Sequence, residues 1–342
     1  MALTTYYPTL IDVARRTAPG GGIDLIAEIL QEYNEMLDDI PWVEGNLPTG
    51  HQTTVRTSKP TPTFRLLNQG VVPVKTTAGQ IVDACAILEA RNEIDRDVAM
   101  LNGNTAAFRL SEDKGIIQSM GDTLADTLIY GDVSVDPEQF NGLASRYFSK
   151  TSTYQTSSQI IDAGGTGSDN CSIYLVCWAP DKVFGIYPKG SRAGLQHEDL
   201  GVQEVLTNAT TGAKMRALVS WYQWKCGICI RDYRYVVRIA NIDNSDLLTA
   251  SNSSDTSANL FKYMSMALDK IPPVGNAGRM AFYMNETCRS MLRVKMLDKS
   301  NVQLSLNDLQ RSSIPRPQGT LTFMGVPCRR LDALTIAEAR IT

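Results

Sequence analysis

The stretch NLPTGHQTTVRTSKPTPTFRLLNQGVVPVKTTAGQIV occupies residues 46–82 and sets the architecture of the chain. Its four prolines exclude a helix and a central strand, whereas its many threonines and valines favour an extended backbone. The pattern therefore predicts two extended arms that leave the body and return. At about 15 residues per arm and roughly 3.3 Å per residue, the tip lies on the order of 50 Å from the body. A connection this long, without a core of its own, usually serves something outside its domain.

The charges of this stretch differ from those of the residues before it. Between Thr17 and Val55 there is no lysine or arginine, but there are seven acids: Asp24, Glu28, Glu32, Glu35, Asp38, Asp39 and Glu44. Residues 46–82 contain no acid and carry four bases: Arg56, Lys59, Arg65 and Lys75. Two adjacent blocks of opposite sign favour an interaction surface, although two solvated surfaces would produce the same pattern.

One helix is predicted before this stretch and another after it. In the acidic block, apolar residues three and four apart predict an amphipathic helix over 23–37, which Pro41 ends. A second apolar stripe, at Ile87, Ile94, Val98 and Leu101, predicts a helix that ends at Asn102-Gly103.

A third helix, over 111–131, has the clearest pattern. Ser111 is the predicted N-cap, acids follow it in the first turn, and Gly131 is the predicted C-cap. Its five apolar positions share one face over about 30 Å: Ile116, Ile117, Met120, Leu124 and Leu128.

Beyond Asp132 the pattern changes to strands. Aromatic and β-branched residues predict strands over 172–178, 182–187, 220–230 and 233–242. A loop over 249–257, a helix over 260–268, and a strand MAFYMN followed by a helix capped by Asn285 complete the prediction. The fold class is therefore α+β.

Composition excludes several classes of function. With 342 residues and a net charge of -3, the chain is not a protein that wraps nucleic acid through bulk positive charge. The N-terminal residues lack the pattern of a secretory signal, and no apolar stretch is long enough to span a membrane. Seven dispersed cysteines indicate reduced thiols rather than a disulfide framework.

No motif supports an enzyme, a metal site or a cofactor site. Cys226 and Cys229 form a C-x-x-C, but a strand directs residues three apart to opposite faces, so we interpret them as small core residues. Gly185 and Gly190 have the spacing of the glycines in a phosphate-binding loop, but the lysine that should follow the second glycine is missing. The two histidines, His51 and His197, have no assignable nucleophile beside them.

Several segments resemble the major capsid proteins of tailed bacteriophages, which have the Hong Kong 97-type fold. EARNEIDRDVAMLNGN, LADTLIYGD and PEQFNGLASRY resemble the long spine helix of that family and the turn that follows it. The resemblance to short-tailed phages in particular rests on KVFGIYPKGSRAGLQHEDLG and WKCGICIRDYRYVVRIANID. MAFYMNETCRSML and TFMGVPCRRLDAL resemble a strand–helix and Gly-Val-Pro pairing of the fold, here in reversed order along the chain.

This resemblance implies a domain organisation. The N-terminal arm would be residues 1–45 and the extended loop 46–82. Residues 83–150, with a spine helix over 111–131, would form part of a peripheral domain. Residues 151–342 would form an axial domain and the remaining peripheral strands, with a permuted order of elements.

The resemblance also implies a function. The chain would be a structural protein that assembles with itself into pentamers and hexamers of an icosahedral virion capsid around double-stranded DNA. Assembly would take place in the host cytoplasm with portal, scaffold and decoration proteins as partners, with weak non-specific DNA contact and no membrane. The shell of a protein nanocompartment is the alternative, and an unrelated α/β enzyme is a further one.

The candidate site is a contact between subunits. The loop would contribute Arg56, Lys59, Phe64, Arg65 and Lys75. Its acidic partners on a neighbouring subunit would be Glu28, Glu32 and Glu35 of the arm or Asp122 and Asp126 of the spine helix. One exposed ion pair contributes only about 0–1 kcal/mol, so the contact would depend on repetition and on apolar burial.

Overall fold

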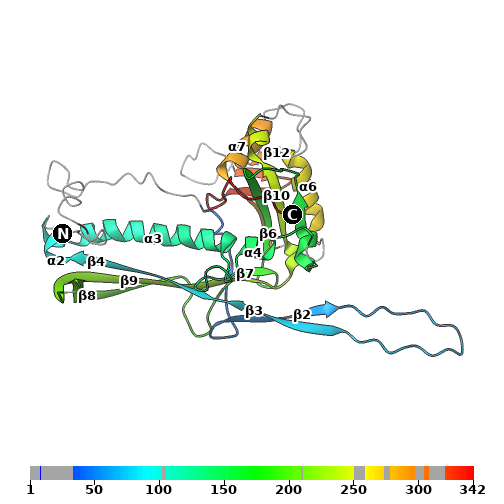
Figure 1. The fold of residues 1–342 in the computed structure, drawn as a ribbon, viewed down its shortest axis with the longest axis horizontal. Helices are drawn as coiled ribbons and strands as arrows, with labels where there is room; N and C mark the ends of the chain where they lie inside the picture. Colours follow the sequence, from blue (N-terminus) through cyan, green and yellow to red (C-terminus); the bar gives the residue numbers. More distant parts are fainter. Residues whose placement is uncertain are drawn as a thin grey trace.

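The computed structural model describes residue 8 and residues 34–101, 105–151, 153–208, 211–249, 259–272, 278–296, 304–307 and 320–342. Figure 1 shows three parts: a lobe built on a sheet, an elongated part in which helix α3 lies along a long ribbon of strands, and a hairpin that projects away from both. The predicted α+β class is confirmed.

The lobe is centred on β6 (Asn170–Trp178), in which every residue is buried. Strands β10 (Val236–Asp243) and β11 (Arg279–Met284) flank it in antiparallel register, and β11 pairs in parallel with β14 (Val326–Arg330). A strand that is covered on both faces has a nearly continuous run of apolar residues in its sequence. The sequence of β6, NCSIYLVCW, is close to such a run. In the lobe, this sheet also includes β1 (Trp42–Glu44), β5 (Ile160–Asp162), β7 (Val183–Tyr187), β12 (Leu304–Asn307) and β13 (Thr320–Phe323).

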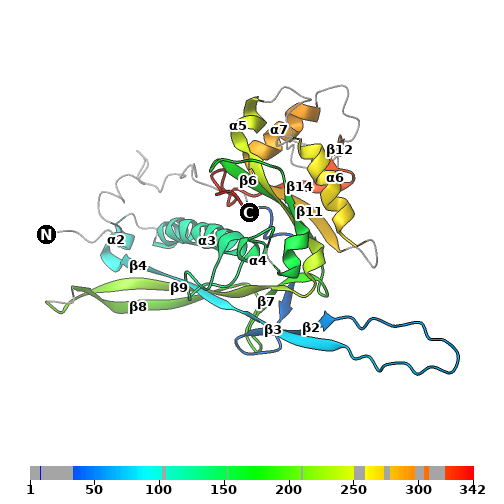
Figure 2. The same ribbon diagram turned by 45° about the vertical axis from the view of Figure 1, so that its right-hand side comes forward.

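Helices and short turns border this sheet. The described helices of the lobe are α4 (Leu143–Arg146), α5 (Asn244–Thr249), α6 (Leu260–Lys270) and α7 (Glu286–Met296), with 3₁₀ turns at Gln155–Gln159 and Tyr233–Tyr235. In Figure 2, α5, α6 and α7 lie around the end of the lobe that is farthest from the ribbon. The predicted cap of α7 is confirmed, because Asn285 Oδ1 accepts the N–H of Thr287 at 3.0 Å.

The ribbon of the elongated part consists of β4 (Ala86–Asp95), β9 (Ala213–Ile230) and β8 (Leu195–Asn208), with β9 in the middle. Helix α3 (Thr105–Tyr130) lies against it and buries apolar side chains such as Phe108 and Leu124. Arg109 fixes the helix to the ribbon: its guanidinium donates to both carboxylate oxygens of Asp199, at 2.8 and 3.0 Å, and to Ser220.

The helix predicted over 87–101 is wrong. Residues 86–95 form β4, and the helix is limited to α2 (Arg96–Met100). Ile87 and Ile94 do not share a helical face; they lie on opposite faces of the strand, one 57% exposed and the other 1%. Because β4 pairs with β9 over ten positions, this long-range ladder prevails over the local apolar spacing.

The helix predicted over 111–131 is present but starts earlier. It begins at Thr105, so Ser111 is an interior residue and not the N-cap. Gly131 follows the last helical residue as predicted, and a Cβ there would lie 2.4 Å from the carbonyl oxygen of Phe140. Of the helix predicted over 23–37, most lies outside the described residues, and residues 35–39 form turns.

The predicted strands beyond Asp132 are confirmed, except that the one predicted over 233–242 starts at Val236, after a 3₁₀ turn, and the interpretation of the C-x-x-C pair is confirmed too. Cys226 and Cys229 lie in β9 and are buried in two different apolar clusters, on opposite sides of the sheet. Burial raises the pKa of each of these two thiols to about 12. Both therefore stay protonated at neutral pH, which does not suit a metal ligand.

The C-terminal segment returns into the lobe and inserts a carboxylate. Glu338 and Arg238 form an ion pair at 2.9 Å, with their side chains 7% and 5% exposed. Tyr130 of α3 donates to Glu338 at 2.6 Å, and Ser172 of β6 donates to the other carboxylate oxygen. Burial, followed by the charge of Glu338, raises the pKa of Tyr130. This cluster joins the helix, the sheet and the C-terminal segment.

Candidate subunit-interaction site

The segment 46–82 forms most of a hairpin of β2 (Gly50–Ser58) and β3 (Thr77–Ala84), which ends two residues beyond it and is paired from Gly50 opposite Ala84 to Ser58 opposite Thr77. Residues 59–76 form an irregular tip beyond the last pair. In Figures 1 and 2 the hairpin and its tip extend away from the rest of the molecule, as the sequence predicts. We call the hairpin with its tip the extended loop.

The extended loop exposes both its charged and its apolar side chains. All five side chains predicted to make the contact are exposed: Arg56, Lys59, Phe64, Arg65 and Lys75. Phe64 is fully exposed, at 108%, and further apolar side chains of the tip are more than half exposed: Leu66, Leu67, Val71, Val72 and Val74. A two-stranded ribbon without a covered face is marginally stable by itself, so a loop of this kind is suited to packing against another surface.

The base of the loop, in contrast, is firmly anchored. Asp83 of β3 is 3% exposed and accepts from Arg146 Nη1 at 2.7 Å, while Arg146 Nη2 donates to the carbonyl of Ile228. The Thr53 hydroxyl contacts the Cys229 thiol at 3.6 Å, and the His51 ring packs edge-on against Phe184. The loop therefore joins a rigid base to an exposed tip.

The predicted acidic partners lie in different settings. Glu35 forms ion pairs inside its own subunit, with Arg329 at 3.3 Å and Arg289 at 3.6 Å. Asp122 accepts from Asn34 of the same chain at 3.0 Å, and Asp126 is exposed on α3. Glu28 and Glu32 lie outside the described residues. Contacts within one subunit do not test a role between subunits, so these assignments stay predictions.

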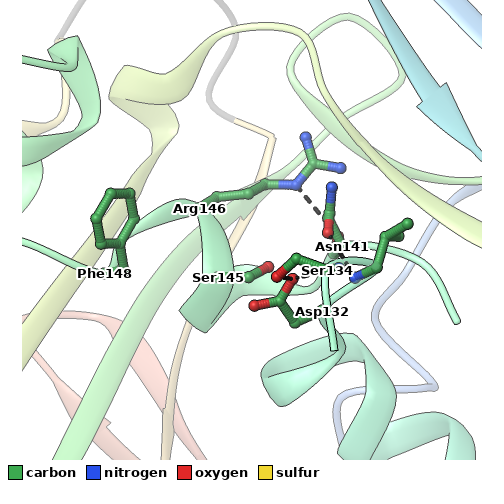
Figure 3. A pocket seen from close by; sticks show the side chains of 7 residues that line it. Asp132, Ser134, Asn141, Ser145, Arg146 and Phe148 are labelled. Atoms are coloured by element: carbon green, nitrogen blue, oxygen red, sulfur yellow. Dashed lines mark hydrogen bonds between the residues drawn. The ribbon is translucent and has the colours of Figure 1, made fainter. Parts of the chain in front are cut away.

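A surface hollow of about 660 Å³ lies next to the loop base, and the sequence analysis did not identify it. We call it the basal hollow; it is lined by Asp132, Val133, Ser134, Asn141, Ser145, Arg146 and Phe148. Figure 3 shows the Phe148 ring apart from the polar group of Asp132, Ser134 and Asn141, with Ser145 and Arg146 between them. The N–H and hydroxyl of Ser134 donate to Asp132 and hold the pKa of that carboxyl below its usual value.

The described residues show no metal site. They contain no cluster of His, Cys, Asp and Glu side chains able to hold a metal ion. No helix among them is long and apolar enough to cross a membrane. His197 lies in β8 and stacks on Tyr222 with ring centroids 4.7 Å apart.

Comparison with known proteins agrees with this architecture. The family model described as major capsid protein GP7 matches residues 18–342. The chain belongs to this family of major capsid proteins. Among the solved structures, a chain of bacteriophage epsilon15 matches with a TM-score of 0.79 and 29% identity, over 100% of both chains. No curated protein matches.

More distant structures resemble this major capsid protein less. The capsid of bacteriophage JBD30 matches with a TM-score of 0.46 and 9% identity, over 90% of this chain and 92% of that one. An encapsulin complex from Synechococcus elongatus matches with a TM-score of 0.42 and 11% identity, over 72% and 99%. TM-scores below 0.5 do not support a shared function, so the nanocompartment alternative gains no support from these structures.

The expected family, fold and function are therefore confirmed. The protein is a major capsid protein with a Hong Kong 97-type fold, a structural component of the shell of a tailed phage. Proteins of this kind assemble with themselves and form part of the virion. In this subunit the extended loop has an anchored base and an exposed tip.

Proposed function

We propose that each subunit holds its neighbour with the extended loop in pentamers and hexamers of an icosahedral shell that encloses double-stranded DNA. The observation that carries this proposal is the exposure of residues 59–76, which combine an apolar tip with basic residues and contain no acid. Exposed apolar side chains gathered on one segment are typical of a surface that contacts another protein.

Two small contributions to the free energy of association, apolar burial and ion pairing, add up because the contact is repeated in every subunit. Burying a side chain such as Phe64 or Leu67 contributes roughly 1.5–3 kcal/mol, and one exposed ion pair adds about 0–1 kcal/mol. Because each copy supplies one loop and receives another, these terms accumulate around a ring. The acids expected to meet the loop are Glu28, Glu32, Glu35, Asp122 and Asp126.

The same proposal covers the wider organisation. Residues 1–45 would be the arm, 83–150 would lie in the peripheral domain, and 151–342 would form the axial domain with the remaining peripheral strands. Assembly would take place in the host cytoplasm with portal and scaffold proteins, and a decoration protein would bind the finished shell. Because the net charge is -3, contact with the packaged DNA would be weak and non-specific.

Reversing two loop charges should impair assembly. In an Arg56→Glu, Arg65→Glu variant we expect each subunit contact to lose about 2 kcal/mol, which corresponds to roughly 30-fold weaker association. The subunit itself should stay folded, because both side chains are exposed. Sedimentation and negative-stain microscopy of the expressed protein measure the yield of shells.

The matched control places the same change of charge elsewhere. Lys214 and Arg216 are exposed on β9, and reversing both changes the net charge equally without altering the loop. That control should assemble normally. We call the proposed contact between the extended loop and a neighbouring subunit the clasp. Normal shells from the loop variant would contradict the clasp. A compact wild-type monomer that never forms capsomers would contradict the shell function itself.

A further inference from the structure

The basal hollow has the size and lining of a docking site. Its volume of about 660 Å³ falls within the roughly 300–1,000 Å³ of typical ligand pockets. Phe148 at its wall is 51% exposed, and Val135 in the adjacent turn is 73% exposed. Tyr154, 66% exposed, packs against Phe148 with ring centroids 6.0 Å apart. The exposed Phe148 ring thus gives the hollow an apolar wall, while Val135 and Tyr154 are exposed apolar residues outside its lining.

Asp132 lines the hollow, and the turn that continues from it carries two further acids. The turn from Asp132 to Phe140 contains Asp136 and Glu138, which are exposed, and has no lysine or arginine. The partly buried Arg146 lines the hollow, but its Nη1 is already paired with Asp83. An occupant of the hollow would therefore be favoured if it combined an apolar side chain with an adjacent positive charge.

The tip of the extended loop has that chemistry. Phe64 and Arg65 are neighbours in the sequence, both are exposed, and no acid lies in residues 46–82. The tip of the same subunit does not occupy the hollow, because Phe64 is fully exposed and its loop leads away from the body. The base of that loop, at Asp83, is bonded to Arg146 of the hollow, so a subunit's own tip and hollow lie at opposite ends of one hairpin.

We infer that the basal hollow receives the loop tip of a second copy of this chain, with Phe64 in the hollow and Arg65 against Asp136 and Glu138. This inference rests on the proposed clasp and names the surface that the clasp engages. The contact is heterologous, since the tip of one copy meets the loop base of the next, and such contacts form a ring when the rotation between copies closes. Each docked tip would also lie beside Arg146, the residue that anchors the next loop.

A second hollow on the ribbon fits the tip less well. It has a volume of about 470 Å³ and is lined by Arg192 together with His197 and Glu198 on β8. An exposed arginine at its edge would repel Arg65. β8 nevertheless carries exposed acids, so it is the appropriate control surface in the tests below.

Cysteine pairs test the contact directly. In assembled shells, a Phe64→Cys, Val135→Cys variant should form a disulfide between subunits when copper-phenanthroline catalyses its oxidation, with dissolved oxygen as the electron acceptor. The two thiols lose two protons and two electrons, and a ladder of linked subunits appears on a non-reducing gel. The control, Phe64→Cys, Val202→Cys, places its second thiol on β8, where Val202 is 51% exposed, and should not form the ladder.

The outcomes separate the inference from the proposed function. A ladder only with Val135→Cys supports docking in the basal hollow. Shells without that ladder, or with a ladder only from Val202→Cys, overturn the inference and leave the clasp in place. A wild-type chain that forms no shells under any condition contradicts the proposed function.

A charge exchange provides a second test that needs no cysteine. Arg65→Glu should reduce the yield of shells several-fold, and Asp136→Lys with Glu138→Lys in the same chain should restore it. Glu198→Lys on β8, which also adds positive charge to an exposed acid, should not restore it. Rescue by Glu198→Lys alone, or by neither change, would overturn the docking site.

Discussion

A chain in which Asn-Gly replaces residues 59–76 should fold like the native subunit and form no shells. Ser58 and Thr77 are the last pair of the hairpin, and their hydroxyl oxygens lie 2.6 Å apart. Asn-Gly is the preferred two-residue connection at such a position, so the shortened hairpin closes without strain. The removed side chains are exposed apart from Pro60, which is partly buried, so their loss should change subunit stability by less than about 0.5 kcal/mol.

Two measurements on the same preparation check this expectation. Urea unfolding should give an unchanged midpoint and slope, and negative-stain microscopy should show no closed particles. A control with Asn-Gly inserted between Leu67 and Asn68, in the turn at the tip, keeps all native residues and should retain some assembly. Closed shells of normal yield from the deleted chain would show that the tip is dispensable.

Glu338→Ala should be the most damaging single substitution for subunit stability. It leaves the Arg238 guanidinium buried without its carboxylate and removes the acceptor of Tyr130 and Ser172. Breaking a buried pair in this way costs about 3–5 kcal/mol, a large part of the total stability of a domain. Urea unfolding of the unassembled subunit, compared with the wild type, measures the loss.

Two further variants separate the charge from the packing. Glu338→Gln keeps the shape and an oxygen acceptor but removes the charge, so it should cost less than Glu338→Ala. Arg238→Met with Glu338→Leu removes both charges together, and it should be less harmful than the single alanine change because no unpaired charge stays buried. A Glu338→Ala subunit as stable as the wild type would contradict the structural role given to this pair.

The loop base and the basal hollow share Arg146, which has a mechanical consequence. The guanidinium lines the hollow and also holds Asp83 at the end of β3. A tip that docks in the hollow would press on the side chain that orients the next loop. Docking of one tip would then help to position the following one, which favours closure of a complete ring.

Sequence alone was sufficient for several features that depend on neighbouring residues. Prolines and β-branched residues predict the extended loop, Asn285 predicts the cap of α7, and apolar runs predict the central strands. Exposure of the tip also follows from its composition, because a segment with no partner strand or helix has no core to enter. The family resemblance rests on the same local motifs, and the family model confirms it.

Tertiary structure decided the features that depend on distant residues. Residues 86–95 form a strand because β9, about 130 residues away, offers a ten-position ladder. Glu35 pairs with Arg329, and Glu338 with Arg238, across separations that no local pattern reports. The basal hollow arises where the end of α3, the turn after it and α4 meet the loop base. The spacing of residue types along a segment determines which backbone conformation that segment prefers. Which side chains are buried and which charges pair is decided only when the whole chain packs.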